Sequence, residues 1–511
     1  MIETQLVTGE DLTVDHVWAV ANDGAPASLS DAAKERMRAA REVVERAAAD
    51  PARTYGVNTG FGRFVSKTIP SQLADELQVR LLRSHACGVG DPYPDEVVRA
   101  ALLLRANALA VGCSGTRIEV AELLVECLNR GVLPRVPSRG SVGASGDLAP
   151  LAHLALPLIG EGEAWVEGER LSGDEALRRV GLEPLRLRAK EGLSLINGTQ
   201  FMAAFGALGA VRARRLAIAA DIACALSTEA LQGSRQSFRP EVQALRPLRG
   251  QAESAENVLS LLEGSAVMDS HRWCGRVQDA YSLRCAPQVH GACRDLIRYV
   301  EETVGVELNA ATDNPLVLVD SGEVVSNGNF HGQPLAFALD VLAMAVSELA
   351  NISERRTERL VNPSLSEGLP AFLAADGGLN SGFMIPQYVA ASLVSENKAL
   401  SHPASVDSIP TSAGQEDHVS MGNAAGLKAW RVLANSESAV AIELLAGAQA
   451  VEFLAPLAPG RGSDAARRFV RTLSPRLAED RPLSGEIEAV ATAIRDGSLA
   501  AAVESKVGEL S

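Results

Sequence analysis

The sequence predicts an all-α protein built around a long central helical bundle, with a loop-rich N-terminal lobe. Alanine, leucine, glutamate and arginine dominate the 511 residues, and these residue types favour helices. Several apolar segments with helical periodicity exceed the usual helix length, whereas strand-like segments are few and short. Loops rich in glycine and proline gather before residue 200. We therefore expect an N-terminal lobe of residues 1–200 and a long-helix lobe of residues 201–511, with a soft boundary that also allows a single domain.

The predicted helices follow one another along the chain, and each depends on apolar residues spaced three or four positions apart. They cover residues 30–49, 95–110, 117–130, 201–232, 288–304, 332–360, 386–400 and 418–450. Residues 201–227 are the most apolar stretch, but Arg212, Arg214 and Arg215 interrupt it. A helix buried inside a folded protein is therefore expected there, and not a membrane span.

The composition favours a small-molecule partner. The net charge of −15 opposes nonspecific binding to nucleic acid or anionic lipid, so neither is expected as a partner. The start, MIETQLVTGEDL, lacks the features of a signal peptide. Seven cysteines without a C-x-x-C pair indicate free thiols in the cytoplasm, and Cys87 is interpreted as an ordinary buried thiol. The eight histidines lack H-E-x-x-H spacing, so no metal site is expected.

The stretch RGSVGASGDLAPLAHLAL, from Arg139 to Leu156, places a run of small residues before an apolar segment that contains proline. Its spacing fits neither the G-x-S-x-G nucleophile elbow nor a lysine-bearing phosphate loop. The dinucleotide pattern G-x-G-x-x-G is also missing, and the preceding GVLPRVPSRG is broken by proline. These mismatches argue against all three interpretations.

Asp147 is expected to cap a helix through LAPLAHLAL, which would place Ala144, Ser145 and Gly146 at the positive end of that helix. Such a turn is most often only a packing feature. An Ala-Ser-Gly turn can, however, close on itself. If the Gly146 nitrogen attacks the Ala144 carbonyl carbon, loss of water gives a five-membered ring. Loss of the Ser145 hydroxyl as a second water then leaves an exocyclic methylidene, which is an electrophile.

At these residues the sequence resembles the aromatic amino acid ammonia-lyases, and most closely their histidine-specific members. The resemblance covers nearly the whole chain through ordered blocks: YGVNTGFG, SHACGVG, GSVGASGDLAPLAHLAL, EGLSLINGTQ, VQDAYSLRC, TDNP, SNGNFHG and QEDHVSMG. It implies a fumarase/aspartase-like helical architecture and a 4-methylidene-imidazol-5-one (MIO) formed autocatalytically from Ala144, Ser145 and Gly146. No metal or dissociable cofactor is implied. A D2 homotetramer whose active sites draw residues from three chains is also implied.

The activity that the resemblance implies is a carbon–nitrogen lyase reaction, in which L-histidine loses ammonia to give trans-urocanate, the first step of histidine degradation. Attack on the MIO by the substrate amine and attack by the imidazole ring both remain open. Two alternatives also remain. One is a phenylalanine or tyrosine ammonia-lyase, or an aminomutase, of the same family. The other is a helical scaffold that has lost catalysis.

Further residue roles are carried over from the resemblance. Tyr55, in TYGVNTGFG, matches the catalytic tyrosine, and we expect it to remove the β-proton. Asn197, in INGTQ, matches a position that hydrogen-bonds the MIO carbonyl or the substrate amine. Phe330, in NGNFHG, matches an aromatic residue near the MIO. Without the family context these would be read as a loop aromatic, a turn and a core residue. His153 and His331 are interpreted as structural histidines.

Two further groups concern substrate binding. Gln278, Tyr281 and Arg284 would share one stripe if their segment is helical. The resemblance implies that Arg284 grips the substrate carboxylate, that Tyr281 assists near the MIO, and that Gln278 supports the carboxylate or amino end. Alone, this pattern would indicate a solvated helix face. His85 and Glu416 match positions that distinguish histidine-specific from phenylalanine-specific members, with Glu416 accepting the imidazole N–H and His85 orienting the other edge.

Overall fold

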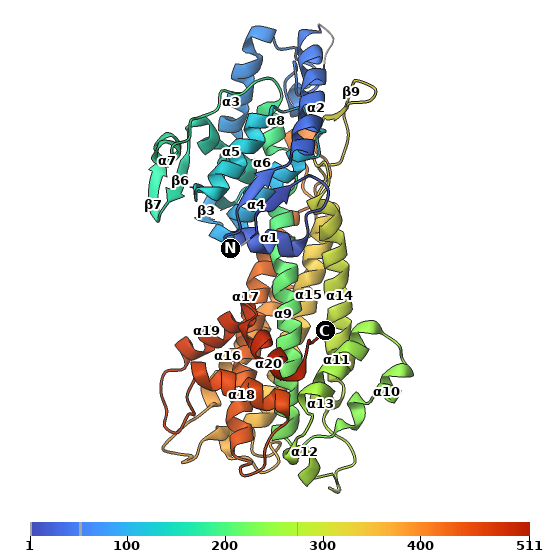
Figure 1. Ribbon diagram of the computed structural model, residues 1–511, viewed down its shortest axis with the longest axis vertical. Coiled ribbons are helices and arrows are strands. Elements are labelled where there is room, and N and C mark those ends of the chain that lie inside the picture. The colour runs from blue at the N-terminus through green and yellow to red at the C-terminus, as the bar shows by residue number, and fades with distance from the viewer. Residues whose placement is uncertain (1–2, 51–53, 273) are drawn as a thin grey trace. The chain divides into compact units, whose positions relative to one another are not determined.

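Helices make up most of the computed structural model, which describes residues 3–50, 54–272 and 274–511 (Figure 1). The all-α prediction is therefore confirmed. The chain forms two compact units that interleave along the sequence. Unit 1 comprises Met1–Leu208, Val300–Asp340 and Pro403–Leu427, and unit 2 comprises Gly209–Tyr299, Val341–His402 and Lys428–Ser511.

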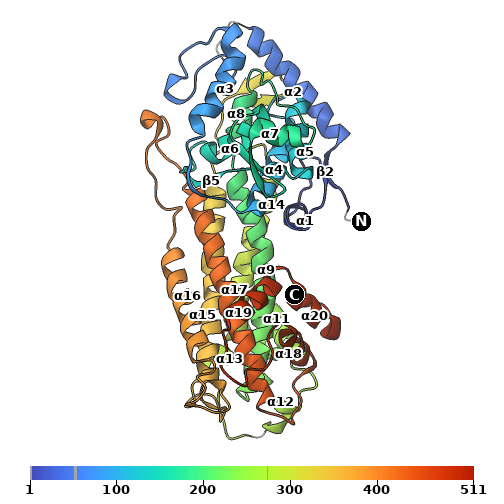
Figure 2. The same cartoon turned by 90° about the vertical axis from the view of Figure 1, so that its left-hand side faces the viewer.

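The N-terminal part of unit 1 is a cluster of short and medium helices. They are α1 (Val14–Ala21), α2 (Asp31–Ala49), α3 (Ala74–His85), α4 (Asp95–Ala110), α5 (Ile118–Asn129), α6 (Leu148–Ala155), α7 (Gly173–Arg179) and α8 (Glu191–Ile196). Helix α4 is buried along almost its whole length, which explains its nearly continuous apolar sequence. Helices α3, α6 and α8 pack against one another, as the view in Figure 2 also shows. Three predicted site residues lie at the ends of these helices: His85 ends α3, Ser145 precedes α6 and Asn197 follows α8.

The strands of unit 1 are short and form small sheets between the helices. The pairs are parallel β1 (Gln5–Val7) with β2 (Ala27–Leu29), and antiparallel β3 (Val89–Pro92) with β5 (Pro137–Arg139) and β8 (Leu316–Leu318) with β9 (Glu323–Val325). A three-stranded sheet joins β4 (Leu133–Pro134), β6 (Glu163–Val166) and β7 (Glu169–Ser172). The prediction of few and short strands is confirmed.

Four long helices match the long apolar segments of the sequence. They are α9 (Gln200–Ala230), α14 (Ala286–Leu308), α15 (Gln333–Val361) and α17 (Gly422–Glu452). Helix α9 is buried on nearly all sides, and the charge of Arg212 is balanced inside unit 2 by a two-point ion pair with Glu437 at 2.8 and 2.9 Å. Among the described residues, α15 alone has the length and composition to cross a membrane, but 67% of its most apolar window is buried inside the protein.

Unit 2 adds shorter helices around its parts of the long ones. They are α10 (Pro240–Ala244), α11 (Arg249–Leu261), α12 (Ala266–Ser270), α13 (Tyr281–Arg284), α16 (Met384–Leu400), α18 (Arg461–Leu473), α19 (Ser484–Arg495) and α20 (Ser498–Val507). Apolar side chains of this unit lie exposed at Val277, Tyr281, Ile385 and Tyr388.

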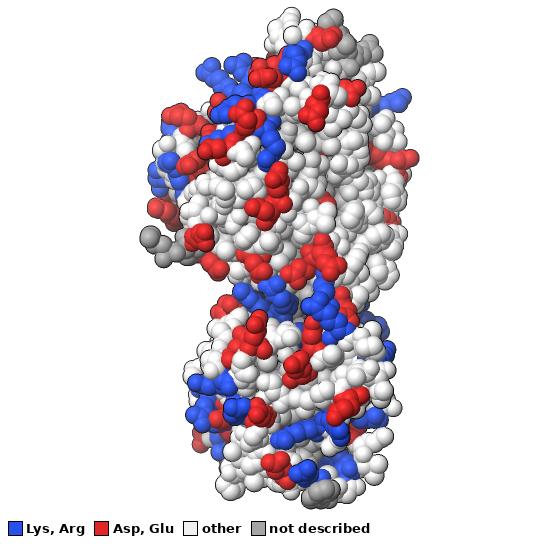
Figure 3. All heavy atoms as spheres, turned by 45° about the vertical axis from the view of Figure 1, so that its right-hand side comes forward, with Lys and Arg blue, Asp and Glu red and all other residues white. Residues whose placement is uncertain are grey.

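Surface charges of both signs are interspersed over the face drawn in Figure 3. All seven cysteines are free, as predicted. The prediction that Cys87 is buried is wrong, because its loop leaves the thiol exposed. Burial instead applies to Cys127, Cys224 and Cys293, where it raises the pKa of each thiol to about 12.

Candidate active site

The Ala144–Gly146 turn lies between β5 and α6 in an unusual backbone conformation. Gly143, Ser145 and Gly146 have φ values of +81°, +49° and +79°, of which only the glycine values are free of steric cost. The turn is held from two sides. Gly198 N donates to Ser145 O at 3.3 Å, Asp147 N donates to Gly198 O at 2.7 Å, and Ser141 Oγ donates to Gly146 O at 3.3 Å. A left-handed serine persists because these contacts over-determine it.

Gly146→Ala is expected to lower the free energy of unfolding by at least about 1–3 kcal/mol. A Cβ at this position would stand 2.0 Å from Gly198 O, which is a backbone atom and cannot move aside cheaply. Denaturant unfolding measures the effect. Gly131→Ala is the matched control, because Gly131 has φ +69° with nothing within 4 Å of its added Cβ. Equal losses in both variants would contradict the clash and leave only backbone strain.

Asp147 does not cap α6 as predicted. Its backbone does precede that helix, but its side chain makes no hydrogen bond there. Instead, Asp147 Oδ2 accepts from the backbone nitrogens of Phe201 and Met202, both at 3.0 Å, in the first turn of α9. Burial raises the pKa of Asp147 to about 7, although these hydrogen bonds oppose the shift. Asp147 bonds to α9 instead of capping α6 because the first turn of α9 presents two N–H groups without intrahelical partners beside the carboxylate.

Asn197 ends α8 and leads into the Gly198 contact with the Ser145 turn. Its side-chain nitrogen Nδ2 donates to Asn314 O at 2.9 Å. The amide oxygen Oδ1 is buried and has no hydrogen-bond partner among the described residues. A buried acceptor without a protein partner is rare, and Oδ1 is therefore available to a donor from a bound molecule.

Tyr55 lies in the glycine-rich loop after residues 51–53, which are outside the described part of the chain. Its ring meets Phe61 edge-on, with centroids 6.2 Å apart. Burial raises the pKa of Tyr55, and the negative charges of Glu416 and Asp313 raise it further. A backbone hydrogen bond from Gly62 acts in the opposite direction.

His85 ends α3, and its Nδ1 lies 2.9 Å from the carbonyl oxygen of Leu81. A carbonyl only accepts, so the proton of the neutral ring belongs on Nδ1, and Nε2 is left as an acceptor. Burial lowers the pKa of His85 and favours this neutral form. Glu416, in the loop before α17, accepts from Thr411 Oγ1 at 2.8 Å.

Five predicted residues line one cavity of about 500 Å³ in unit 1: Tyr55, His85, Ser145, Asn197 and Glu416. Apolar side chains such as Leu77, Leu148 and Leu193 complete its wall. A mostly apolar cavity with a few convergent polar groups is the usual form of a small-molecule site. Phe330, between β9 and α15, is half-buried in unit 1 and is not among the lining residues.

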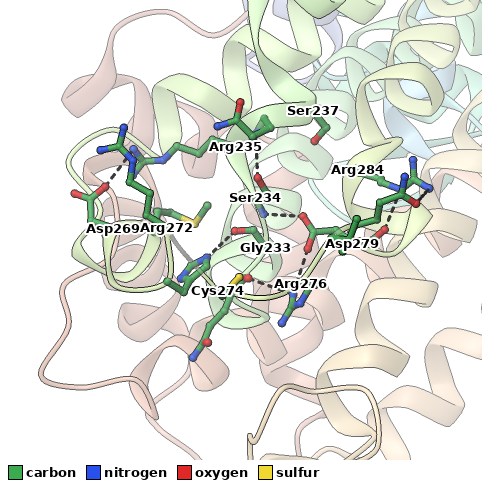
Figure 4. Close-up of a pocket in the computed structure, with 16 residues that line it drawn as sticks. Gly233, Ser234, Arg235, Ser237, Asp269, Arg272, Cys274, Arg276, Asp279 and Arg284 are labelled. Carbon is green, nitrogen blue, oxygen red and sulfur yellow. Dashed lines mark hydrogen bonds and ion pairs between the residues drawn. The ribbon is translucent and has the colours of Figure 1, made fainter.

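The remaining three predicted residues belong to unit 2. Gln278 and Arg284 line a second cavity of about 530 Å³ (Figure 4), and Tyr281 lies beside Arg284 with 71% of its surface exposed. Arg284 is held by Asp279 O at 2.9 Å and Gln278 Oε1 at 3.0 Å, and its guanidinium lies 4.5 Å from the centre of the Tyr281 ring. The predicted common helix stripe is wrong, because α13 begins only at Tyr281 and Gln278 precedes it in a nonhelical segment.

Sequence reasoning missed two supporting residues. Thr411 orients Glu416, and nothing in its local sequence signals this contact. Arg105 lies fully buried on α4 and donates to Asn197 O at 2.8 Å. A single arginine inside the apolar run AALLLRANALA was the signal that could have found it, because a charge is seldom buried without a specific partner. Among the described residues, His, Cys, Asp and Glu form no group of three suited to a metal ion.

The comparisons with known proteins agree over almost the whole chain. The aromatic amino acid lyase family model matches residues 12–472. The chain is 57% identical over 505 residues to the histidine ammonia-lyase of Gloeobacter violaceus, covering 99% of this chain and 98% of that one. The solved histidine ammonia-lyase of Trypanosoma cruzi has a TM-score of 0.91 and 45% identity, covering 98% of this chain and 95% of that chain. The tyrosine aminomutase of Streptomyces globisporus has a TM-score of 0.94 and 38% identity, covering 99% and 100%.

With these matches, the helical fold and its mostly apolar cavity with convergent polar groups define a carbon–nitrogen lyase of the ammonia-lyase class. The family model spans far more than half of the sequence, and the relatives are aligned from end to end. The chain belongs to the aromatic amino acid lyase family.

Proposed function

We propose that this chain is a histidine ammonia-lyase that converts L-histidine into trans-urocanate and ammonia, the first step of histidine degradation. The observation that carries the proposal is that Tyr55, His85, Ser145, Asn197 and Glu416 all line the same cavity in unit 1. These residues come from five separate segments of the sequence. The histidine ammonia-lyases among the relatives support the same substrate.

The proposed electrophile is the MIO made from Ala144, Ser145 and Gly146. The residues fit this group. Gly146 has no side chain to block the approach of its nitrogen, the turn is already left-handed at Ser145, and the orphan Asn197 Oδ1 lies at the same cavity. When formed, the group supplies an electrophilic methylidene carbon conjugated to the Ser145 carbonyl, so a nucleophile that adds there sends electron density onto that oxygen.

The remaining cavity residues divide between proton transfer and recognition. Tyr55 removes the β-proton, and Asn197 offers its free amide oxygen to the substrate amine. Glu416 accepts the imidazole N–H. The other nitrogen of a neutral imidazole is an acceptor, so His85 orients that edge by donating from Nε2, in the tautomer opposite to the one that Leu81 O favours. A phenyl ring would leave these polar groups unsatisfied, so the cavity discriminates against phenylalanine.

The activity is expected to rise with pH from neutral into the alkaline range. Tyr55 accepts a proton only as the phenolate, and its pKa lies above the ordinary value of about 10 because of burial and the nearby carboxylates. Below that pKa the phenolate fraction increases about tenfold per pH unit. Tyr55→Phe is expected to lose at least about a hundredfold in kcat. Profiles of kcat against pH for both proteins measure this, and a Tyr55→Phe enzyme with the wild-type profile would exclude Tyr55 as the base.

We further propose a D2 homotetramer with shared active sites. Gln278, Tyr281 and Arg284 belong to unit 2, whereas the cavity belongs to unit 1. In the proposed assembly these residues, together with Phe330, complete the cavities of neighbouring copies, where Arg284 binds the substrate carboxylate. Exposed Val277 and Tyr281 support a partner surface beside them. Sedimentation velocity of the active enzyme is expected to give four chains, and an active monomer would contradict the proposal.

Incubation with L-histidine tests the function directly. Urocanate absorbance and ammonia are expected to increase together in equal amounts. A β-amino acid product would instead indicate an aminomutase, and turnover of phenylalanine or tyrosine alone would indicate another lyase of the family. An intact mass without the loss of two waters, together with no turnover, would indicate a silent scaffold. The free thiols support the cytoplasmic location that the proposal includes.

A further inference from the structure

Arg105 is a buried cation that lies directly behind the Asn197–Gly198 turn. It has no exposed surface, and its NH1 donates to Asn197 O at 2.8 Å and to Gln200 Oε1 at 2.9 Å. Its Nε and NH2 groups find no acceptor among the described residues. A guanidinium that is buried with unfilled donors is costly for stability, so packing alone does not account for it.

The charge of Arg105 is only partly compensated. In the described part of the chain, no carboxylate lies within ion-pair distance of its guanidinium. Asp313 acts on it from farther away, but Asp313 Oδ2 is already bound to the buried Lys190 Nζ at 2.7 Å. Burial lowers the pKa of Arg105 to about 10, which still leaves it protonated at neutral pH. Asp313 therefore lies near both Arg105 and Lys190, but it is bonded to Lys190 only.

A chain of hydrogen bonds connects this cation with Ser145. Arg105 donates to the carbonyl oxygen of Asn197, and the N–H of the same peptide unit, on Gly198, donates to Ser145 O at 3.3 Å. Hydrogen bonds in series polarise one another, so a charged donor at one end strengthens the donor at the other. One peptide unit thus separates the guanidinium from the Ser145 carbonyl.

We propose that Arg105 is a positioning residue that polarises the Asn197–Gly198 peptide toward the Ser145 carbonyl oxygen. The inference rests on the proposed function, because that oxygen would receive electron density if a nucleophile adds to the methylidene of the MIO. A preorganised donor at a place where negative charge develops is among the strongest contributions an enzyme makes to its rate. Arg105 acts through the peptide and does not line the cavity.

The surrounding residues hold this alignment. A Cβ on Gly198 would stand 2.6 Å from Arg105 NH1 and 2.5 Å from Gln200 Oε1, so only glycine allows the guanidinium this close. Gln200 is fixed in turn by its Nε2, which donates to Thr312 Oγ1 at 2.9 Å. Gln200 is therefore a neutral acceptor held against the cation, and a carboxylate of the same shape would neutralise Arg105 in place.

Gln200→Glu is the sharpest test because it preserves shape and the bond to Arg105 while cancelling the charge. We expect kcat for L-histidine to fall at least about tenfold, with KM changed less than about threefold. The intact mass should still show the loss of two waters, and the near-ultraviolet band of the MIO should shift to shorter wavelength as its carbonyl becomes less polarised. Thr312→Val is the matched control, since it removes a bond to Gln200 but no charge, and it should keep kcat within about threefold.

Arg105→Lys and Arg105→Met complete the series. Lysine keeps the positive charge but lacks the planar set of N–H donors of the guanidinium. The Arg105→Lys variant should therefore retain a higher kcat than Arg105→Met if both variants fold, as judged by thermal melting and sedimentation. A Gln200→Glu enzyme with wild-type kcat and an unshifted band would overturn the proposal and leave Arg105 a purely structural role. If the wild-type enzyme itself produced no urocanate, the proposed function would fail, which is a different result from failure of the Arg105 role.

Discussion

Ser145→Ala is expected to yield a folded protein whose turnover of L-histidine falls by at least about a thousandfold, because the group that carries the difficult chemistry is not made. The substitution deletes one oxygen atom from the turn. Alanine keeps the backbone contacts of the turn, in which Ser145 O accepts from Gly198 N. Relative to the wild-type chain before cyclisation, the free energy of unfolding is therefore expected to change by less than about 1 kcal/mol.

Intact mass and the urocanate assay measure this result together. The wild-type chain should be lighter than its sequence mass by two waters. The variant should not lose the water that comes from the Ser145 hydroxyl, because it lacks that hydroxyl. Ser353→Ala is the matched control, because it deletes the same atom at a buried site in unit 2 where Oγ has no hydrogen-bond partner among the described residues. Activity of Ser145→Ala within about tenfold of wild type would refute the MIO assignment.

Glu416→Gln is expected to reduce kcat/KM for L-histidine by at least about a hundredfold, since an amide replaces the charged acceptor of the imidazole N–H. The mass should still show the loss of two waters, because Glu416 lies outside the Ser145 turn. The ring of phenylalanine or tyrosine would leave polar groups of the cavity without partners. The wild-type enzyme should therefore prefer L-histidine over L-phenylalanine and L-tyrosine by at least about a hundredfold in kcat/KM.

The same variant has a second readout in its pH profile. The negative charge of Glu416 raises the pKa of Tyr55, so neutralising it should lower that pKa and move the alkaline rise of kcat to lower pH. Asp417→Asn is the matched control, because it removes the neighbouring exposed carboxylate. Near-normal histidine turnover by Glu416→Gln, or equal turnover of phenylalanine by the wild type, would contradict the substrate assignment even if lyase activity remains.

The helices with clear periodicity were predictable from the sequence. The expected segments 30–49 and 95–110 correspond to α2 (Asp31–Ala49) and α4 (Asp95–Ala110). Burial of one face, or of the whole helix, produces a spacing of apolar residues that can be recognised within the segment itself. Short segments carry less of this signal. Gln278 and Arg284 have helical spacing, yet only Tyr281–Arg284 forms a helical turn, and Arg284 reaches Gln278 by a side-chain hydrogen bond.

The supports of the candidate site could not be predicted in this way, because they join distant parts of the chain. Asp147 binds the start of α9, although its neighbours in sequence predict a cap on α6. Arg105 and Asn197 are 92 positions apart, and no periodicity records their contact. The interleaving of the two units has the same cause, since residues 300–340 and 403–427 join unit 1 through tertiary contacts alone.

The contact between Gly198 and the Ser145 turn also has a consequence for the maturation of a newly synthesised chain. Asp147 N and Ser145 O find their partners on Gly198, and Asp147 Oδ2 finds its partners on α9, so the turn is braced only after both segments have docked. In the proposed enzyme, cyclisation of Ala144–Gly146 therefore requires that the surrounding native structure has already formed. The covalent change would then record that a chain has folded correctly. Chains whose intact mass still includes both waters would be those that never reached the native structure.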